Sequence, residues 1–313
     1  MFAIADSDPC SKVTDTPESS ALIAVSTKNV MPSPGCLALH HHHQVYTAFQ
    51  DFQADLPTLF AQALYLEEAE RAIRTLGILE PLTGRHLPPE ELLINGSNYR
   101  ESIVGRGCLS RHRALIMVLQ QVYGNQEALG HQAIYLSEAL TGFSRILQEW
   151  SPQVILSEYL EGVEDSAHDG IRHEDLCRLN FDDRSFNLVI TNDVFEHVRS
   201  LPMALSEIHR VLSSGGRLIC TFPFAYGQTE TIRKAIHHPE DGHVELLTDV
   251  ELHGDPVRPT VGSMVYQIPG WDVLDLARSA GFGRCVIHYI SAWKHGVLGG
   301  EIPGVFVMEA QRL

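Results

Sequence analysis

Several side chains that can do chemistry directly follow short apolar runs in this sequence. Four such groups occur: Ser137-Glu138 with Thr141-Gly142, Ser157-Glu158-Tyr159, His173-Glu174-Asp175-Leu176, and Asn192-Asp193-Val194-Phe195-Glu196-His197. Carboxylates and amides hold polar ligands, and histidine exchanges a proton near neutral pH. An open parallel sheet binds ligands beyond the carboxyl ends of its strands. If the apolar runs are strands of such a sheet, the four groups meet at one ligand site.

Two histidines are the candidate general bases. His197 closes the fourth group, and His253 belongs to the loop segment HGDP, in which Asp255 or the nearby Glu251 is placed to orient it. Each has a plainer interpretation, because His197 can simply pack beside the sheet and HGDP can be only a turn. Glu196 likewise can be a carboxylate favoured at a helix N-terminus.

The elements expected to position these residues alternate along the chain from Gln132 onward. Short apolar runs and helical segments follow one another, which predicts βαβ units with a parallel sheet. The expected strands are 133–136, 154–156, 170–173, 186–190 and 217–222, and the expected helices are 143–150, 201–212 and 271–280. Gly215-Gly216 is expected to end the helix that begins at Leu201. Strands at 286–290 and 305–309 are expected to close the sheet as a terminal hairpin.

The chain divides into three parts by its composition and hydrophobic periodicity. Residues 1–44 lack periodicity and are predicted to be a flexible leader, whose His40–His43 tract is taken as a segment with adventitious metal affinity, so that no metal site is assigned. Residues 45–125 predict a helical N-terminal subdomain, with Pro57 beginning a second helix. Residues 126–313 form the main domain, with a lid-like insertion at about 225–269.

The composition excludes some classes of partner. Lys and Arg number 23 against 39 Asp and Glu, a net charge of −16 that would repel a nucleic-acid backbone. No apolar run is long enough to cross a bilayer, and the first residues do not read as a signal peptide, so we expect a cytoplasmic protein without membrane contact. The six cysteines form no CxxC pair and are expected to be reduced thiols.

An arginine-rich stretch interrupts this acidic composition. Arg100, Arg106, Arg111 and Arg113 lie in YRESIVGRGCLSRHRAL. Such a cluster can receive an anionic substrate group or a carboxylate of the cofactor. A solvated helix face is the favoured interpretation.

One segment carries a resemblance to a known family. FNLVITNDVFEHVRSLPMALSEIHRVLSSGGRLICTFPF resembles the central signature of class I S-adenosylmethionine-dependent methyltransferases, and the likeness covers about residues 132–224 and extends more loosely through GWDVLDLARSAGF. The resemblance implies an α/β fold with a Rossmann-like, seven-stranded, mostly parallel sheet and a terminal antiparallel strand. The N-terminal helices would then form a cap.

The first loop departs from the family pattern. YLSEALTGFSR retains only Gly142 of the usual Gly-x-Gly-x-Gly, whose glycines let the backbone approach the cofactor. A narrower resemblance links the chain to bacterial methyltransferase-like proteins that combine an E-x-x-T loop with SEY, HEDL, VFEHV and HGDP motifs. In such proteins a glycine-poor loop is a family trait, and Glu138 would hydrogen-bond the ammonium group of the cofactor.

The resemblance implies a role for each candidate residue. Glu158 would hold the cofactor ribose, Asp175 and Leu176 would flank the adenine, and Asn192 to His197 would line the methionine and substrate side. The predicted cofactor-binding residues are Glu138, Thr141, Glu158, Tyr159, Asp175, Leu176, Asn192 and Asp193, and the predicted catalytic residues are His253, His197 and Asp255.

The expected reaction is methyl transfer from S-adenosylmethionine to an oxygen of a small molecule, such as a specialised metabolite or a sugar. Two alternatives are kept: a methyltransferase-like binding or regulatory protein without catalysis, and an enzyme that uses the same pocket for a non-methylating reaction.

Overall fold

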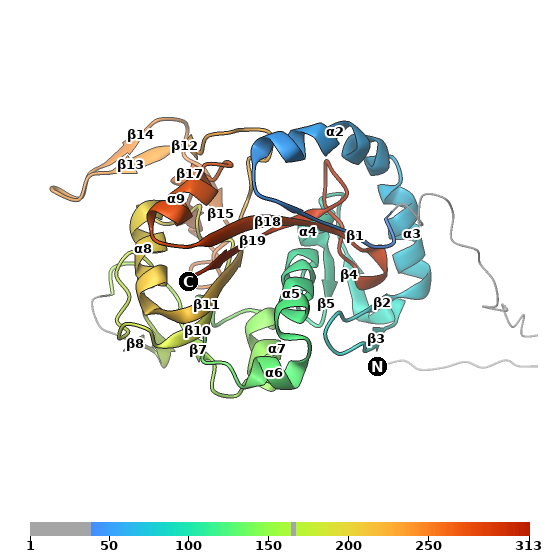
Figure 1. Cartoon of the computed structure of the whole chain (residues 1–313), viewed down its shortest axis with the longest axis horizontal. Coiled ribbons are helices and arrows are strands. Elements are labelled where there is room, and N and C mark those ends of the chain that lie inside the picture. Colours follow the sequence, from blue (N-terminus) through green and yellow to red (C-terminus); the bar gives the residue numbers. More distant parts are fainter. Residues whose placement is uncertain (1–38, 164–166) are drawn as a thin grey trace, which may run out of the picture. The chain divides into compact units, whose positions relative to one another are not determined.

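A seven-stranded sheet carries the fold of the computed structural model, which describes residues 39–163 and 167–313 (Figure 1). Most of the predicted leader lies outside the described residues. Across the sheet the strands follow the order β1 (His42–Tyr46), β18 (Arg284–Ser291), β19 (Val305–Gln311), β11 (Leu212–Thr221), β10 (Phe186–Asn192), β6 (Ile134–Leu136) and β7 (Ile155–Leu156).

Four neighbouring strands of this sheet are parallel. β10 pairs in parallel with β11 on one side and with β6 on the other, and β6 pairs in parallel with β7. The strand order therefore reverses between β6 and β10, and such a reversal opens a crevice at the carboxyl ends of the strands. β19 pairs antiparallel with β11 and β18, which confirms the predicted terminal hairpin and the α/β fold class.

Helices cover both faces of the sheet because successive side chains of a strand point to opposite faces. In β10, Leu188 and Ile190 pack in one buried core with α5 (Ser110–Tyr123), α6 (Gln126–Gly130) and α7 (Gly142–Trp150). Val189 packs in the other core with α8 (Leu201–Val211) and α9 (Val273–Ser279). Figure 1 shows these two groups of helices on different sides of the sheet. The apolar run predicted to be buried on both faces is thus confirmed.

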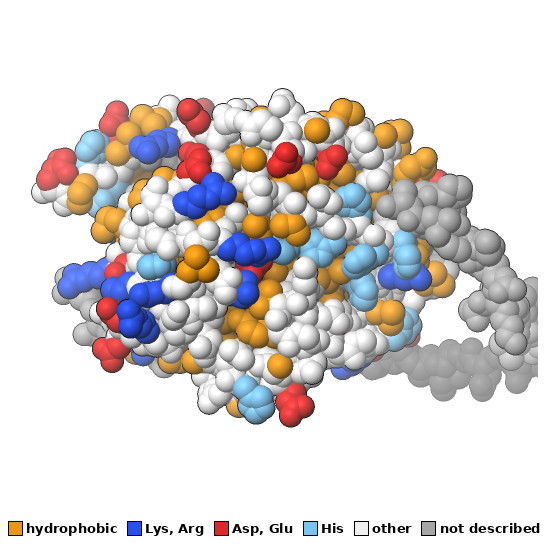
Figure 2. All heavy atoms as spheres, in the orientation of Figure 1, with side chains coloured by type: hydrophobic (Ala, Val, Ile, Leu, Met, Phe, Trp, Pro, Cys, Tyr) orange, Lys and Arg blue, Asp and Glu red, His pale blue; other side chains and the backbone are white. Residues whose placement is uncertain are grey.

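The edges of the sheet differ from the prediction. His42 and His43, placed in the predicted leader, belong to β1, which pairs antiparallel with β18, and His43 Nε2 lies 2.8 Å from His288 Nδ1. Figure 2 shows histidine side chains gathered over this part of the molecule. At the other edge the strand predicted at 170–173 is the short β9 (Ile171–Arg172), which pairs antiparallel with β8 (Ala167–His168) outside the large sheet, and His173 forms a single parallel bridge with Glu158.

Two predicted helix boundaries were wrong. α8 ends at Val211, and Gly215-Gly216 lie in β11, at a register shift opposite β10. Gly215 has a φ of 79°, and its N–H bonds to the Arg312 carbonyl at 2.8 Å, so these glycines form a bulge rather than a helix stop. Pro57 lies inside α2 (Phe49–Ala63), because burial of Phe52 and Leu59 on one face outweighs the break that proline favours.

The rest of the region 45–125 mixes helices with short hairpins. α3 (Leu66–Leu76) packs in a third buried core with the pairs β2 (Ile78–Leu79) with β3 (His86–Leu87) and β4 (Leu92–Ile94) with β5 (Ile103–Gly105). A short helix, α4 (Tyr99–Ser102), joins β4 to β5. The predicted helical region therefore contains small β-elements, and α5 is part of the layer against the sheet.

The segment predicted as a lid-like insertion folds as three short antiparallel pairs. They are β12 (Ile232–Arg233) with β17 (Gln267–Ile268), β13 (Ala235–His237) with β14 (Val244–Leu246), and β15 (Leu252–His253) with β16 (Ser263–Met264). The β13–β14 hairpin projects from the body (Figure 1). Among the described residues, no helix combines the length and apolarity needed to cross a membrane.

Candidate functional site

A cavity of about 1340 Å³ lies at the carboxyl ends of the four parallel strands. The ends of β6, β7, β10 and β11 form its floor, and residues of the insertion and of the N-terminal region form its walls. Every predicted cofactor-binding and catalytic residue lines it: Glu138, Thr141, Glu158, Tyr159, Asp175, Leu176, Asn192, Asp193, His197, His253 and Asp255. The structure thus brings together residues that the sequence places on five separate segments.

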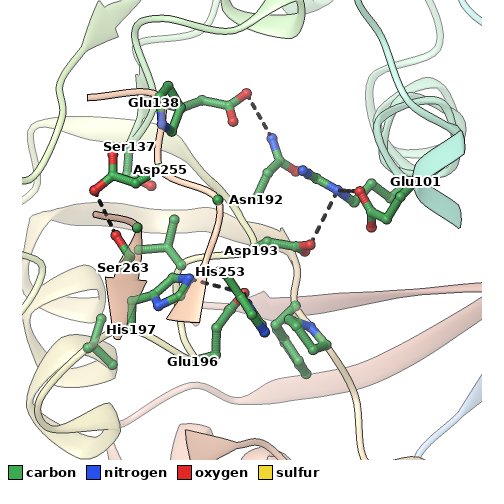
Figure 3. A pocket seen from close by; sticks show the side chains of 18 of the residues that line it. Glu101, Ser137, Glu138, Asn192, Asp193, Glu196, His197, His253, Asp255 and Ser263 are labelled. Carbon is green, nitrogen blue, oxygen red and sulfur yellow. Dashed lines mark hydrogen bonds and ion pairs between the residues drawn. The ribbon is translucent and has the colours of Figure 1, made fainter. Parts of the chain in front are cut away.

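Glu138 lies where the strand order reverses. Its Oε1 accepts hydrogen bonds from Thr141 Oγ1 at 3.0 Å and from Asn192 Nδ2 at 3.2 Å, and Figure 3 shows the second of these bonds. Burial raises the pKa of Glu138 to about 7, against the effect of Arg111 and of these two donors. A carboxyl group that titrates near neutral pH inside a cleft is a feature of functional sites, although structural networks also produce it.

Side chains rather than glycines hold the first loop. Glu158 Oε1 accepts from the backbone N–H groups of Ala139 at 2.8 Å and Leu140 at 3.1 Å, and Thr141 caps α7 by accepting from Ser144 N. Burial raises the pKa of Glu158. A Cβ atom on Gly142 would lie 2.4 Å from Gly107 Cα, so this glycine is required by contact with the N-terminal region.

Asp193 sits at the centre of an ion-pair network. Arg100 donates to both of its carboxylate oxygens, at 2.8 and 2.6 Å, and Arg111 Nε lies 3.3 Å away. Glu101 pairs with both arginines, and Thr221 Oγ1 donates to Asp193 at 3.0 Å. Burial alone would raise the pKa of Asp193, but the two guanidinium groups hold it well below its usual range. Asp193 is therefore ionised and fully paired at neutral pH.

The favoured prediction for the arginine stretch was wrong. Arg113 is 1% exposed and donates to the carbonyls of Cys108, Ile103 and Gly296, so it has a structural role in the interior. Arg100 and Arg111 line the cavity, where they are paired as described. Their partner Asp193, which comes from a distant segment, explains why these arginines do not form a solvated helix face.

The residues predicted to flank the adenine lie at the far side of the cavity. Leu176 is buried, and Asp175 Oδ1 accepts from Cys177 N at 2.8 Å. Tyr159 is 41% exposed and its hydroxyl accepts from Arg199 at 2.9 Å. This side offers an apolar side chain and an exposed aromatic ring, which suits a planar ligand.

His197 and His253 meet at Glu196 (Figure 3). Glu196 Oε1 lies 3.6 Å from His197 Nε2 and 3.7 Å from His253 Nδ1, and the two imidazole rings are perpendicular with centroids 5.3 Å apart. Burial raises the pKa of Glu196, whereas Glu196 and Glu251 together raise the pKa of His253. The plain interpretation of Glu196 as a helix N-terminal group was wrong, because α8 begins only at Leu201.

Glu251, not Asp255, orients His253. Glu251 Oε1 lies 3.0 Å from His253 Nε2. The described hydrogen bonds of Asp255 go to its own loop, from the backbone N–H groups of Val257 and Arg258 and from Ser263 Oγ at 2.8 Å. Asp255 therefore shapes the cavity wall, and its predicted catalytic role stays a prediction.

Sequence reasoning missed the importance of Arg100, Arg111 and Glu196 to the cavity. Glu196 was named as part of a strand-end group, but its burial without hydrogen-bond partners depends on the insertion that covers it. The signal available in the sequence was the occurrence of VFEHV together with a later HGDP motif, because the two motifs contain two histidines and two carboxylates.

Comparison with known proteins gives a match over the central part of the chain. Residues 140–220 match the model of a family described as a methyltransferase domain. A search of the curated proteins finds no match.

Two of the similar solved structures illustrate the structural comparison. A S-adenosylmethionine-dependent methyltransferase from Mesorhizobium loti is 15% identical, with a TM-score of 0.39 over 63% of this chain and 98% of that one. A 1,6-didemethyltoxoflavin-N1-methyltransferase from Burkholderia thailandensis, with bound 1,6-didemethyltoxoflavin and S-adenosylhomocysteine, is 15% identical, with a TM-score of 0.37 over 64% of this chain and 78% of that one.

The family match spans the end of the first loop, the VFEHV turn, α8 and most of β11, and of these the loop and the turn contribute residues to the cavity. The α/β sheet around them has the order and the directions described above. Residues 140–220 therefore match a methyltransferase domain, a match that supports S-adenosylmethionine as the cofactor.

Proposed function

We propose that this protein transfers the methyl group of S-adenosylmethionine to a hydroxyl oxygen of a small molecule. The observation that carries the proposal is the convergence of all the predicted residues in one cavity of about 1340 Å³. Ligand pockets usually measure roughly 300–1,000 Å³, so the space suffices for a cofactor and an acceptor side by side.

The sheet side of the cavity suits the cofactor. Glu138 and Asn192 lie together at the reversal of strand order, where Glu138 would accept from the cofactor ammonium group. Glu158 follows the second parallel strand and would bind the ribose hydroxyls, while Leu176 and Tyr159 would contact the adenine. Along the strand ends, Glu138 therefore suits the charged amino group of S-adenosylmethionine, Glu158 suits its polar ribose, and Leu176 with Tyr159 suits its planar adenine.

The opposite wall suits the acceptor. When bound, S-adenosylmethionine supplies an electrophilic methyl group, and the electron pair of the broken carbon–sulfur bond stays on sulfur. The protein must then position the acceptor and take up the proton of its hydroxyl group. His253 and His197 line the cavity on this side, and we propose that they perform this proton transfer.

The acceptor class follows from the polarity of the cavity lining. Besides the histidines the cavity is lined by Tyr266 and by Arg258, which pairs with Glu161 and Asp255, and these polar groups suit a ligand with several hydroxyl groups. A sugar or a hydroxylated specialised metabolite is the acceptor that we propose.

Calorimetric titration with S-adenosylmethionine and with S-adenosylhomocysteine tests the cofactor side. We expect micromolar binding of both ligands, followed by methyl transfer in a screen of hydroxylated acceptors. Binding without transfer to any acceptor would favour a non-methylating reaction, and no binding to folded protein would leave a fold without the cofactor function.

Cofactor affinity is expected to increase with pH around the pKa of Glu138. Because that pKa is raised to about 7, the carboxyl group is mostly neutral below pH 7 and mostly ionised above it. Only the ionised form pairs with an ammonium group, so affinity should rise about tenfold from roughly pH 6 to 8.

The matched control is Glu138→Gln, which keeps the shape and cannot ionise. Titrations of this variant should show weaker binding and lack the wild-type increase over the same pH range. Tighter binding by the glutamine variant would rule out the role of Glu138.

A further inference from the structure

The strongest unexplained feature of the cavity is the environment of Glu196. Its side chain is fully buried, and neither carboxylate oxygen has a hydrogen-bond partner among the described residues. A buried carboxylate without hydrogen bonds is costly, and the cost is usually met by a bound cation or a proton. Of the described residues, Glu196, His197 and His253 make the one group that could hold a metal ion, with one ligand atom from each lying within 4.8 Å of the others.

The hydrogen bonds of the two imidazoles determine which nitrogen faces Glu196. His197 Nδ1 lies 2.8 Å from the Met264 carbonyl, which can only accept, so Nδ1 carries the proton. His253 Nε2 lies 3.0 Å from the Glu251 carboxylate, so Nε2 carries the proton. In the neutral rings His197 Nε2 and His253 Nδ1 are therefore unprotonated and carry a lone pair, and both nitrogens face the Glu196 carboxylate.

We propose that Glu196, His197 and His253 bind a divalent transition-metal ion. Zinc bonds to imidazole nitrogen and carboxylate oxygen are about 2.0–2.2 Å long, which puts tetrahedral ligand atoms roughly 3.3 Å apart. The two observed separations from Glu196 Oε1, 3.6 and 3.7 Å, need only a small inward movement to reach this value. Charge-assisted hydrogen bonds between the same groups would be about 2.7–2.9 Å long, so the separations leave room for an ion.

The surroundings match those of histidines that bind metals. Such histidines donate their second ring N–H to a backbone carbonyl or a carboxylate, and here Met264 O and Glu251 accept these bonds. Glu251 is itself paired with Lys234. The β15–β16 pairing sets Leu252 opposite Met264, so a single hairpin carries one ligand and orients the other.

The backbone of the Glu196 turn is also held by the insertion. Tyr266 N donates to the Glu196 carbonyl at 2.8 Å, and Gln267 Nε2 donates to the carbonyls of Phe195 and Val198. The site is thus preorganised rather than assembled from free loops. Imidazole and carboxylate ligands together suit Zn²⁺, Fe²⁺ and related borderline ions more than Ca²⁺ or Mg²⁺.

The ion would have open positions toward the acceptor. The side chains of His197 and His253 are 20% and 32% exposed, and both line the cavity, whereas Glu196 closes the site from behind. An ion held there would make a hydroxyl group that enters the cavity more acidic. The histidines would then be ligands of the ion, and the hydroxyl proton would pass to solvent water instead of to a histidine. This role in catalysis rests on the proposed function, but binding of the ion does not.

Metal binding is measured on the full-length protein after chelator treatment, without S-adenosylmethionine. Titration with Zn²⁺ is followed by calorimetry and by the melting temperature, and Co²⁺ is followed by its visible absorption. We expect one equivalent to bind with micromolar or tighter affinity and to raise the melting temperature. Glu196→Gln and His253→Gln should each weaken binding at least 100-fold and abolish the Co²⁺ absorption.

Two control variants separate this site from other histidines. His243→Gln changes an exposed histidine of the same insertion, and a double variant with His40→Gln and His41→Gln changes the histidine tract before β1. Both should retain the bound equivalent. Binding that is unaffected by Glu196→Gln, or that is lost in the tract variant, overturns the proposal, as does the absence of any bound ion.

Misfolding of the glutamine variant would not obscure the result. Because Glu196→Gln removes a buried charge, the metal-free variant should unfold at the same denaturant concentration as metal-free wild type or a higher one. The two proposals also fail separately. Zinc binding without S-adenosylmethionine binding would reject the proposed function and leave the metal site, and the reverse outcome would reject the metal site alone.

Discussion

Replacing Asp193 by asparagine is expected to lower the free energy of unfolding by about 3–5 kcal/mol, because it removes the buried carboxylate of Arg100 and Arg111 and leaves them only the more exposed Glu101. All three side chains are largely buried, with exposures of 17%, 20% and 13%. Asp193 has a φ of 52°, a left-handed conformation that asparagine also tolerates, so the loss reports on the charge and not on the backbone. Denaturant unfolding of both proteins at neutral pH measures the loss of stability.

An exposed pair of the same residue types provides the comparison. Asp183 pairs with Arg210 at 2.9 Å, but the Asp183 side chain is 72% exposed. Asp183→Asn should cost about 0–1 kcal/mol. Equal losses for the two variants would show that the Asp193 network contributes no more than a surface ion pair.

The pH dependence of the Asp193 contribution has a defined sign. Because the folded protein lowers the pKa of Asp193, the contribution is complete above the unfolded pKa of about 4 and is lost as pH falls toward the folded value. The difference in stability between wild type and Asp193→Asn should therefore be constant near neutrality and shrink in acid.

Cofactor binding is expected to weaken about 100-fold in Glu158→Ala, equivalent to about 2.7 kcal/mol. Two charge-assisted hydrogen bonds from ribose hydroxyls account for a loss of this size. Glu158 also accepts from the backbone N–H groups of Ala139 and Leu140, so its removal additionally loosens the first loop. Calorimetric titration with S-adenosylhomocysteine measures the total effect.

The two contributions of Glu158 can be separated. Glu158→Gln retains an oxygen for the loop N–H groups but loses the charge, and we expect about tenfold weaker binding. An analogue that lacks the ribose 2′-hydroxyl should bind wild type less tightly than the parent compound does. Glu158→Ala should bind the analogue at least as tightly as it binds the parent compound. A constant penalty for the analogue in both proteins would contradict contact with the ribose. Glu149→Ala, which removes an exposed carboxylate outside the cavity, should bind normally.

The sheet and its two faces were largely predictable because their signals are local. The apolar run at 186–190 and the helix from Leu201 show their periodicity within single windows of sequence, and the structure confirms both. The prediction that strand-end residues meet required only that the strands be parallel, since parallel strands present their carboxyl ends at one edge. For this reason Glu138, Glu158 and Asn192 were identified without coordinates.

Features that depend on partners distant in sequence were not predictable. β1 is a strand because it pairs with the edge strand β18, and no pattern within His42–Tyr46 predicts that partner. Pro57 stays inside α2 because burial of one face of the helix outweighs the tendency of proline to interrupt it. Gly215-Gly216 read as a helix stop, whereas pairing with the C-terminal residues makes them a bulge.

The same distinction holds for the cavity. By itself the sequence determined the fold class, the methyltransferase signature and the set of strand-end groups, because each depends on residue types over a short stretch. Only the tertiary structure decided that Arg100 and Arg111 neutralise Asp193, and that the β15–β16 hairpin directs His253 and His197 toward the unpartnered carboxylate of Glu196. Charge pairing and the choice of ring nitrogen depend on distances of a few ångströms between segments, which sequence spacing does not specify.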